Sequence, residues 1–191
     1  MTVFISYRHT DRAQAMAINK RLTEEGISTY LDVLDVESQS TDDITSVITR
    51  RISESTHLIA VVSSQTAQSW WVPFEIGEAT ITYRRICSYR TTVSELPEYL
   101  SKWPQMTKPS EIELFIQSYK NEISGKRQIT LESFNGSEAM RRVDKVNADT
   151  FLADLKQRIR RGYYYHTLNF RFATCYMVIY RMVLDMWKYV S

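Results

Sequence analysis

The sequence predicts an α/β fold in which a doubly wound parallel sheet is covered by helices on both faces. Short apolar runs alternate with amphipathic segments through the first half of the chain. The run Leu58–Val62 is continuously apolar, which is typical of a central parallel strand covered on both sides. Because strands and helices alternate at this interval, we expect right-handed crossovers and therefore parallel strands.

Each element of this half carries its own signal. Ala15, Ile18 and Leu22 recur at helical spacing, and Gly26 follows them as a stop. The predicted elements in chain order are the strand Val3–Ser6, the helix Asp11–Glu25, the strand Ile27–Leu31, the loop Val33–Ser40, the helix Thr41–Ser53, the strand Leu58–Val62, the helix Trp71–Arg84 and a weaker strand Ile86–Tyr89.

The second half of the chain is predominantly helical in pattern. Ser110 followed by Glu113 forms a capping box, which predicts a helix through about Ile123. A second amphipathic helix is predicted over Asp149–Arg161, and Gln128–Leu131 is a candidate short edge strand.

From Tyr163 to its end the sequence is very rich in aromatic residues. A membrane span is disfavoured, because Arg171, Arg181 and Asp185 interrupt the run below the ~20 apolar residues that a span needs. We expect instead a helix that packs on the domain or on another subunit.

Length, charge and cysteine content narrow the class of protein. The 191 residues fit one large domain, or one domain with an appended element. Lys plus Arg number 24 against 22 for Asp plus Glu, and the net charge of +2 gives no case for a nucleic-acid or membrane-surface binder. Cys87 and Cys175 lie far apart without ligands at metal spacing, which favours buried thiols over a disulfide or zinc site. With no secretory signal at the start, we expect a cytoplasmic protein.

Two short segments are predicted to form one site. In Val3–Arg8, an apolar strand ends at the small polar residue Ser6 and continues into an aromatic residue and a cation. Such strand ends line the ligand crevice of open α/β sheets. In the second segment, Trp70–Ile76, the carboxylate of Glu75 comes one helical turn after a Trp. If the segments converge, they form an aromatic slot that contains one acid.

These segments resemble the TIR (Toll/interleukin-1 receptor) domain over about residues 2–89, and specifically its NAD-cleaving branch. Val3–Arg8 is similar to the first-strand motif of the family, and Tyr30–Asp32 to the end of the second strand. Val33–Thr41 would then be the loop that gates the nucleotide pocket and mediates assembly; it has Ser38, Gln39 and Ser40 where the family usually carries a Gly. Trp71–Glu75 is similar to the Trp-x-x-x-Glu element, whose Glu is catalytic.

The resemblance implies a flavodoxin-like fold, with a TIR domain over residues 1–125 and a helical C-terminal extension over 126–191. It also implies that NAD+ is the substrate, with no further cofactor and no metal. Asp32 and Asp35 could be read as ligands of a divalent ion, but two acids in a loop are more often turn residues. The expected catalytic residue is Glu75, and the expected NAD-binding residues are Phe4, Ser6, Tyr7, Arg8, Asp32 and Trp71.

The chemistry of NAD cleavage suits a site with one carboxylate. The reaction expels neutral nicotinamide from a pyridinium, so no general acid is needed, unlike the two-carboxylate glycosidases. Glu75 would bond the ribose hydroxyls and offset the positive charge that develops on the sugar. Phe4, Tyr7 or Trp71 could stack on the cationic nicotinamide, which is worth on the order of 1 kcal/mol, and Arg8 is placed to meet a phosphate.

The same residues also have structural explanations. An acid such as Glu75 in the first turn of a helix is favoured by the macrodipole alone. Trp71 can be a core residue, and Arg8 a solvated cation at a strand end. The order of the motifs favours the functional interpretation.

Two classes of function therefore stay open. One is an enzyme that converts NAD+ to ADP-ribose or a cyclic isomer; the other is a non-enzymatic TIR scaffold that acts by TIR–TIR assembly. A nucleoside deoxyribosyltransferase shares the sheet and uses a Glu, but the Val3–Arg8 motif speaks against it. The resemblance is to stand-alone prokaryotic TIR proteins, which implies a nucleotide signal for a separate effector in antiphage defence of the Thoeris type. A secreted virulence protein is the rival setting.

Overall fold

The computed structural model describes residues 1–31, 44–65, 71–92, 96–129 and 141–162. Its centre is a five-stranded parallel sheet with strand order β2-β1-β3-β4-β5. The strands are β1 Thr2–Ser6, β2 Ser28–Leu31, β3 His57–Val62, β4 Arg85–Arg90 and β5 Gln105–Met106. The chain adds β2 on one side of β1 and then continues on the other side with β3. The sheet is thus doubly wound, as predicted, and its topological switch point lies between β1 and β3.

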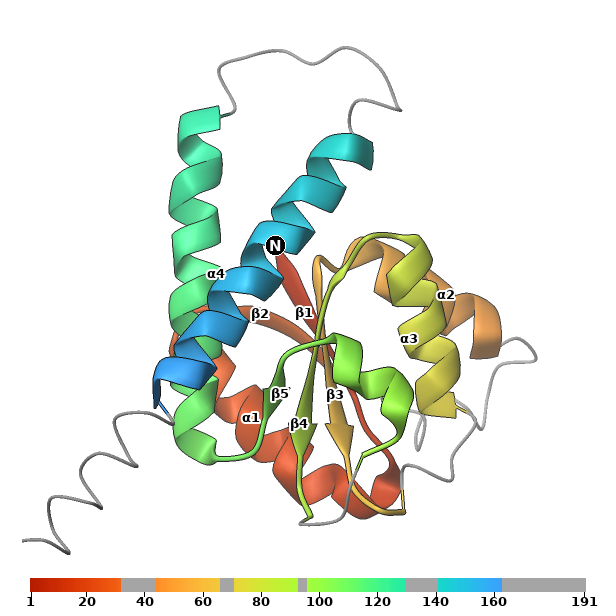
Figure 1. Ribbon diagram of the computed structural model, residues 1–191. Coiled ribbons are helices and arrows are strands. Elements are labelled where there is room, and N and C mark those ends of the chain that lie inside the picture. Colours follow the sequence, from red (N-terminus) through yellow and green to blue (C-terminus); the bar gives the residue numbers. More distant parts are fainter. Residues whose placement is uncertain (32–43, 66–70, 93–95, 130–140, 163–191) are drawn as a thin grey trace, which may run out of the picture. The chain divides into compact units, whose positions relative to one another are not determined.

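One face of the sheet is covered by two helices, α2 (Ile44–Glu54) and α3 (Trp71–Ile81), which Figure 1 shows side by side. Alternate residues of the strands point to this face, because side chains of a strand alternate in direction. They form a single buried core with the helices: Phe4, Leu58, Ala60, Val62 and Ile86 from the strands, Ile48 and Ile52 from α2, and Val72, Ile76 and Ala79 from α3.

Val3 and Ile5 alternate with Phe4 and therefore point to the other face. The buried side chains available to cover this face lie on α1 (Arg12–Glu24), which follows the short 3₁₀ helix η1 (His9–Asp11), and on α4 (Pro109–Ile129). They are Ala15, Ile18 and Leu22 on α1, and Ile112, Phe115 and Ile116 on α4.

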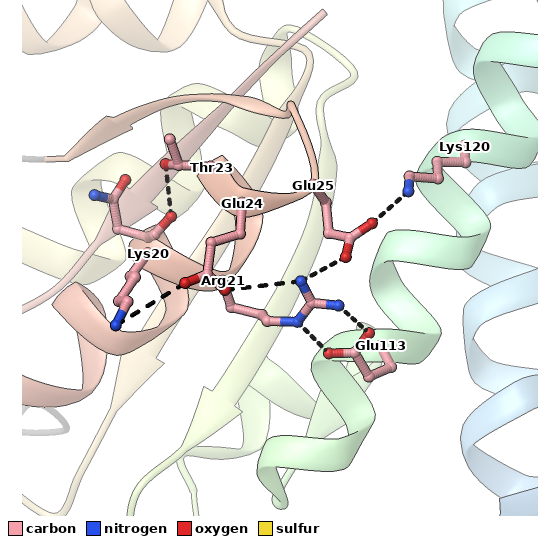
Figure 2. Close-up of polar contacts among 8 residues, drawn as sticks. Lys20, Arg21, Thr23, Glu24, Glu25, Glu113 and Lys120 are labelled. Carbon is pink, nitrogen blue, oxygen red and sulfur yellow. Dashed lines mark hydrogen bonds and ion pairs between the residues drawn. The ribbon is translucent and has the colours of Figure 1, made fainter.

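A group of charged side chains joins α1 to α4 (Figure 2). Arg21 donates from Nε and Nη2 to the two carboxylate oxygens of Glu113, at 2.6 and 2.8 Å. Glu25 lies between two cations, 2.5 Å from Arg21 Nη1 and 2.5 Å from Lys120 Nζ. The two cations hold the pKa of Glu25 below its usual range, Lys120 contributing most. The network thus connects α4 to α1 and to Glu25, the residue that follows α1.

A second polar cluster is buried at the amino edge of the sheet, where β3 and β4 begin. Arg85 is 1% exposed and donates from Nη2 to Glu122 Oε1 at 2.6 Å. The other oxygen of Glu122 lies 3.2 Å from Nε2 of the fully buried His57. Three rings surround this imidazole, at centroid distances of 4.6 to 5.7 Å: Phe115, Tyr119 and Phe151.

Several predicted boundaries are wrong. The helix predicted through Arg84 ends at Ile81, because Tyr83 adopts a left-handed conformation (φ 53°) and the Arg84 N–H closes the end on Ala79 O. The candidate edge strand Gln128–Leu131 is wrong in its first two residues, since α4 continues through Ile129. The last described helix occupies residues 141–162 and begins well before Asp149.

Three further described elements were not predicted: the 3₁₀ helix η1, the 3₁₀ helix η4 (Glu98–Lys102) and the strand β5. By its contacts the chain divides into two compact units, Met1–Lys156 and Gln157–Ser191. The first contains the whole sheet. The expected domain boundary at 125/126 stays a prediction, and the aromatic segment from Tyr163 onward lies outside the described residues.

Candidate functional site

The two predicted motifs meet at the carboxyl edge of the sheet, at the switch point. Ser6 is the last residue of β1 and is fully buried; it lies opposite Ala60 of β3 in the parallel register. In open α/β sheets, ligands bind in the crevice outside the carboxyl ends of the strands at this point. The sequence prediction that Val3–Arg8 leads into such a crevice agrees with this topology.

Glu75 comes to the same place from α3. Val72, Ile76 and Ala79 form the apolar stripe that packs α3 on the sheet, and Glu75 falls on this stripe by helical periodicity. Its carboxylate is consequently fully buried, and Ser6 Oγ donates a hydrogen bond to Glu75 Oε2. The structure thus joins the first-strand motif and the Trp-x-x-x-Glu element through one direct hydrogen bond.

The helix-dipole explanation for Glu75 is wrong. The first turn of α3 contains no acid, because the helix begins at Trp71 and Glu75 is its fifth residue. The effect of the helix dipole falls off within the first turn. Pro73 does occupy that turn, where the N–H that proline lacks would have no partner within the helix. A buried carboxylate on the core-facing stripe therefore needs another reason than helix stability.

Arg8 follows the end of β1 by two residues and is exposed. Its guanidinium donates from Nη1 to the backbone oxygen of Gln65 at 2.7 Å, so it reaches from the end of β1 to the segment after β3. A guanidinium carries five N–H groups in a fixed fork that matches phosphate oxygens. The expected phosphate contact is compatible with this position.

The other predicted binding residues fall into three groups. Tyr7 follows Ser6 and is 8% exposed. Phe4 is fully buried and stacks on Tyr30 at a centroid distance of 5.5 Å, so its ring supports β1 from within the core. Trp71 begins α3, but its side chain lies outside the described part of the structure, as do Asp32 and the loop Val33–Thr41.

Sequence reasoning missed one charged residue of this edge, Asp11. It is 4% exposed and accepts hydrogen bonds from Ser63 and Thr91, which directly follow β3 and β4. The sequence does contain a signal for this cluster. A residue with a hydroxyl group closely follows each of two predicted strands, and an acid comes shortly after the first strand of the chain.

Other chemistries find little support in the described ranges. Within them, no group of three or more His, Cys, Asp and Glu side chains is arranged to hold a metal ion. Cys87 is a free, fully buried thiol whose pKa is raised by burial, and a thiol in this state is a poor nucleophile. None of the described helices is both long and apolar enough to cross a membrane.

Two cavities lie away from Glu75. One of about 640 Å³ is lined by α1, Tyr89 and the start of α4; one of about 350 Å³ lies between α4 and residues 147–154. The first has one acid in its lining, Glu113, and both oxygens of that carboxylate are bonded by Arg21. The candidate site therefore stays at the switch point.

Solved structures of TIR domains are similar to this chain at low sequence identity. The TIR domain of the Toll-related receptor TRR-2 from Hydra magnipapillata is 17% identical, with a TM-score of 0.49; the match covers 64% of this chain and 97% of that one. The TIR domains in the activated Roq1 resistosome, which directly recognizes the pathogen effector XopQ, are 16% identical, with a TM-score of 0.42 and coverages of 84% and 98%.

A metazoan TIR-STING receptor from C. gigas is 21% identical, with a TM-score of 0.43, and the match covers 52% of this chain but only 35% of the receptor. No curated protein matches the sequence. The family model of the TIR domain matches residues 3–107, which is more than half of the chain and includes β1 to β5. The chain therefore belongs to the TIR domain family.

Proposed function

We propose that this TIR domain protein cleaves the nicotinamide–ribose bond of NAD+. The observation that carries the proposal is the buried carboxylate of Glu75, which accepts a hydrogen bond from Ser6 at the switch point of the sheet. Burying a carboxylate costs several kcal/mol unless it is well compensated. Residues that break the local rules of a fold are expected at functional sites.

The reaction needs an acid in this setting. The bond between the nicotinamide nitrogen and ribose C1′ breaks, its electron pair returns to the ring nitrogen, and nicotinamide leaves as a neutral molecule. Positive charge then develops on the sugar, where a preorganised carboxylate in a water-poor pocket is most effective. Attack by water, with loss of a proton, gives ADP-ribose; attack by a group of the same nucleotide gives a cyclic isomer.

Each residue has a distinct role in the proposal. Glu75 bonds the ribose hydroxyls and stabilises the cation, and Ser6 holds its carboxylate in orientation. Arg8 binds a phosphate at the rim, while Tyr7 and Trp71 are candidates to stack on the nicotinamide. Asp32 remains a proposed binding residue at the end of β2. NAD+ is the substrate in this scheme, with no other cofactor and no metal.

The test compares Glu75→Gln with Glu78→Gln, which makes the same chemical change three residues further along α3. Purified proteins at high concentration are incubated with NAD+, and nicotinamide and ribosyl products are separated by chromatography and identified by mass. We expect wild type and Glu78→Gln to release nicotinamide, and Glu75→Gln to lose at least about a hundredfold in rate. The product mass separates hydrolysis from cyclisation.

Absence of turnover in the wild type, even when concentrated or assembled, would contradict the proposal and favour the TIR scaffold. Equal turnover by wild type and Glu75→Gln would overturn the role of Glu75 but not the cleavage of NAD+. We further propose, on the resemblance to stand-alone TIR proteins, that the protein self-associates through its TIR domain. Its product would then act as a cytoplasmic signal for a separate effector, in antiphage defence.

A further inference from the structure

The carboxylate of Asp11 is buried at the point where three neighbouring strands end. Its Oδ2 accepts a hydrogen bond from Ser63 Oγ at 2.9 Å, and its Oδ1 accepts one from Thr91 Oγ1 at 3.2 Å. Ser63 directly follows β3 and Thr91 directly follows β4, while Asp11 itself comes five residues after the end of β1. One side chain thus connects the ends of β1, β3 and β4.

The position of Asp11 in its own helix does not explain this burial. Asp11 is the N-cap residue of α1, where an Asp side chain usually accepts a hydrogen bond from the first helical turn. Here the side chain makes no such cap hydrogen bond. The hydrogen bonds from Ser63 and Thr91, which directly follow β3 and β4, offset part of the cost of burying this carboxylate.

A second contact joins the same two strand ends. Arg8 Nη1 donates to Gln65 O at 2.7 Å, so the segment after β1 is attached to the segment after β3 both here and at Asp11. The two attachments are linked, because the Asp11 N–H donates to Arg8 O at 2.7 Å and closes the turn between them.

We propose that Asp11 is a positioning residue, which fixes the end of β1 against β3 and β4 and so sets the geometry of the Glu75 site. The inference rests on the proposed function. Ser6, the hydrogen-bond donor to Glu75, lies in the segment that Asp11 anchors. A displacement of about 1 Å in a reacting group can cost on the order of a hundredfold in rate. Both oxygens of Asp11 face hydroxyl donors of the sheet edge, so its role is to position and not to react.

Kinetics of two variants test the proposal. Asp11→Asn replaces one acceptor oxygen by a donor, and the double variant Ser63→Ala, Thr91→Val removes both hydroxyls. The control is Ser64→Ala, at the exposed residue next to Ser63. For folded protein we expect both test variants to lower kcat about tenfold or more, with KM changed less than about twofold, while the control matches wild type.

A merely structural role would lower the yield or the unfolding midpoint and leave kcat per folded molecule unchanged, and that result would overturn the proposal. A rise in KM with unchanged kcat would overturn it as well, because it would make Asp11 part of substrate binding.

Hydrogen–deuterium exchange gives a readout that does not depend on turnover. In Asp11→Asn we expect peptides that cover residues 4–9 and 60–65 to exchange faster than in wild type, while peptides from α4 are unchanged. If the wild type does not cleave NAD+, the proposed function fails, but the exchange result still decides on the connection between the strand ends. Unchanged exchange at both segments would overturn that connection.

Discussion

At the carboxyl edge of the sheet, the buried residues Glu75 and Asp11 accept hydrogen bonds from hydroxyl groups, whereas at the amino edge the half-buried Glu122 lies beside a buried guanidinium and a buried imidazole. A cation both bonds a carboxylate and neutralises its charge. A carboxylate that is paired in this way is typical of a structural ion pair. A hydroxyl donor orients a carboxylate and contributes no opposite charge. In the contacts described here, the acids of the two edges are therefore bonded by donors of different charge.

The aromatic surroundings support the same distinction. At the amino edge, Phe115, Tyr119 and Phe151 surround His57, and Arg85 is 1% exposed. At the carboxyl edge, the exposed Arg8 comes two residues after the buried Ser6, which bonds the buried Glu75. We expect the amino edge to contribute stability, and the proposed function places its chemistry at the carboxyl edge.

The largest effect on stability is expected for Glu122→Gln. It removes the charge that compensates Arg85, which is 1% exposed, and breaking a buried pair in this way costs about 3 kcal/mol or more. Urea denaturation measures the loss in the free energy of unfolding. The control is Glu98→Gln, the same change at an exposed residue, which should stay within about 0.5 kcal/mol of wild type. Equal effects of the two variants would contradict the structural role of the amino edge.

A smaller, pH-dependent effect is expected for Tyr119→Phe. Its hydroxyl donates to Met1 O at 2.6 Å, and losing this hydrogen bond costs about 1 kcal/mol. Burial, and then the charge of Glu122, raise the pKa of Tyr119 from 10.0 to about 12. Because the folded state holds this proton more tightly, its stabilising effect is complete below pH 10 and is lost as the pH rises through 12.

The unfolding midpoint of wild type should therefore fall more steeply between pH 10 and 12 than that of Tyr119→Phe. The exposed Tyr83→Phe serves as the control and should keep the wild-type slope. If the unfolding midpoint of Tyr119→Phe fell with pH as steeply as that of wild type, ionisation of Tyr119 would not be the cause of the pH dependence.

The smallest effect is expected for Arg21→Lys, in the half-exposed network between α1 and α4. Lysine keeps the charge but cannot form the two parallel hydrogen bonds to Glu113. Exposed pairs are screened by solvent, so we expect the unfolding midpoint to change by no more than about 2 °C in a thermal melt. If Arg21→Lys lost as much stability as Glu122→Gln, the difference in burial would not explain how much each cluster contributes to stability.

The strands and the candidate site could be predicted where the signal is local. Short, mainly apolar segments mark β1, β3 and β4 to within a residue at each end, because central parallel strands are covered on both faces. The strand β5 has only two residues, Gln105 and Met106, which is too short for any periodicity. Likewise, nothing in the sequence near Gln128 shows that α4 continues there.

The candidate site was predictable only in part, because only some of its residues belong to a local sequence pattern. Ser6 and Glu75 each belong to a recognisable motif, so their meeting could be expected. Asp11 sits at a helix start, where an Asp needs no special explanation, and its partners are 52 and 80 residues away. The amino-edge cluster depends on pairings of comparable separation, which only the folded chain reveals.

The most direct test of the assignment of the two edges is nicotinamide release from NAD+ by Glu75→Gln and Glu122→Gln, measured together well below the unfolding midpoints of both. We predict that Glu75→Gln stays folded and loses turnover, while Glu122→Gln loses stability and keeps wild-type turnover per folded molecule. Turnover that persists in Glu75→Gln, or that disappears in folded Glu122→Gln, would contradict the account.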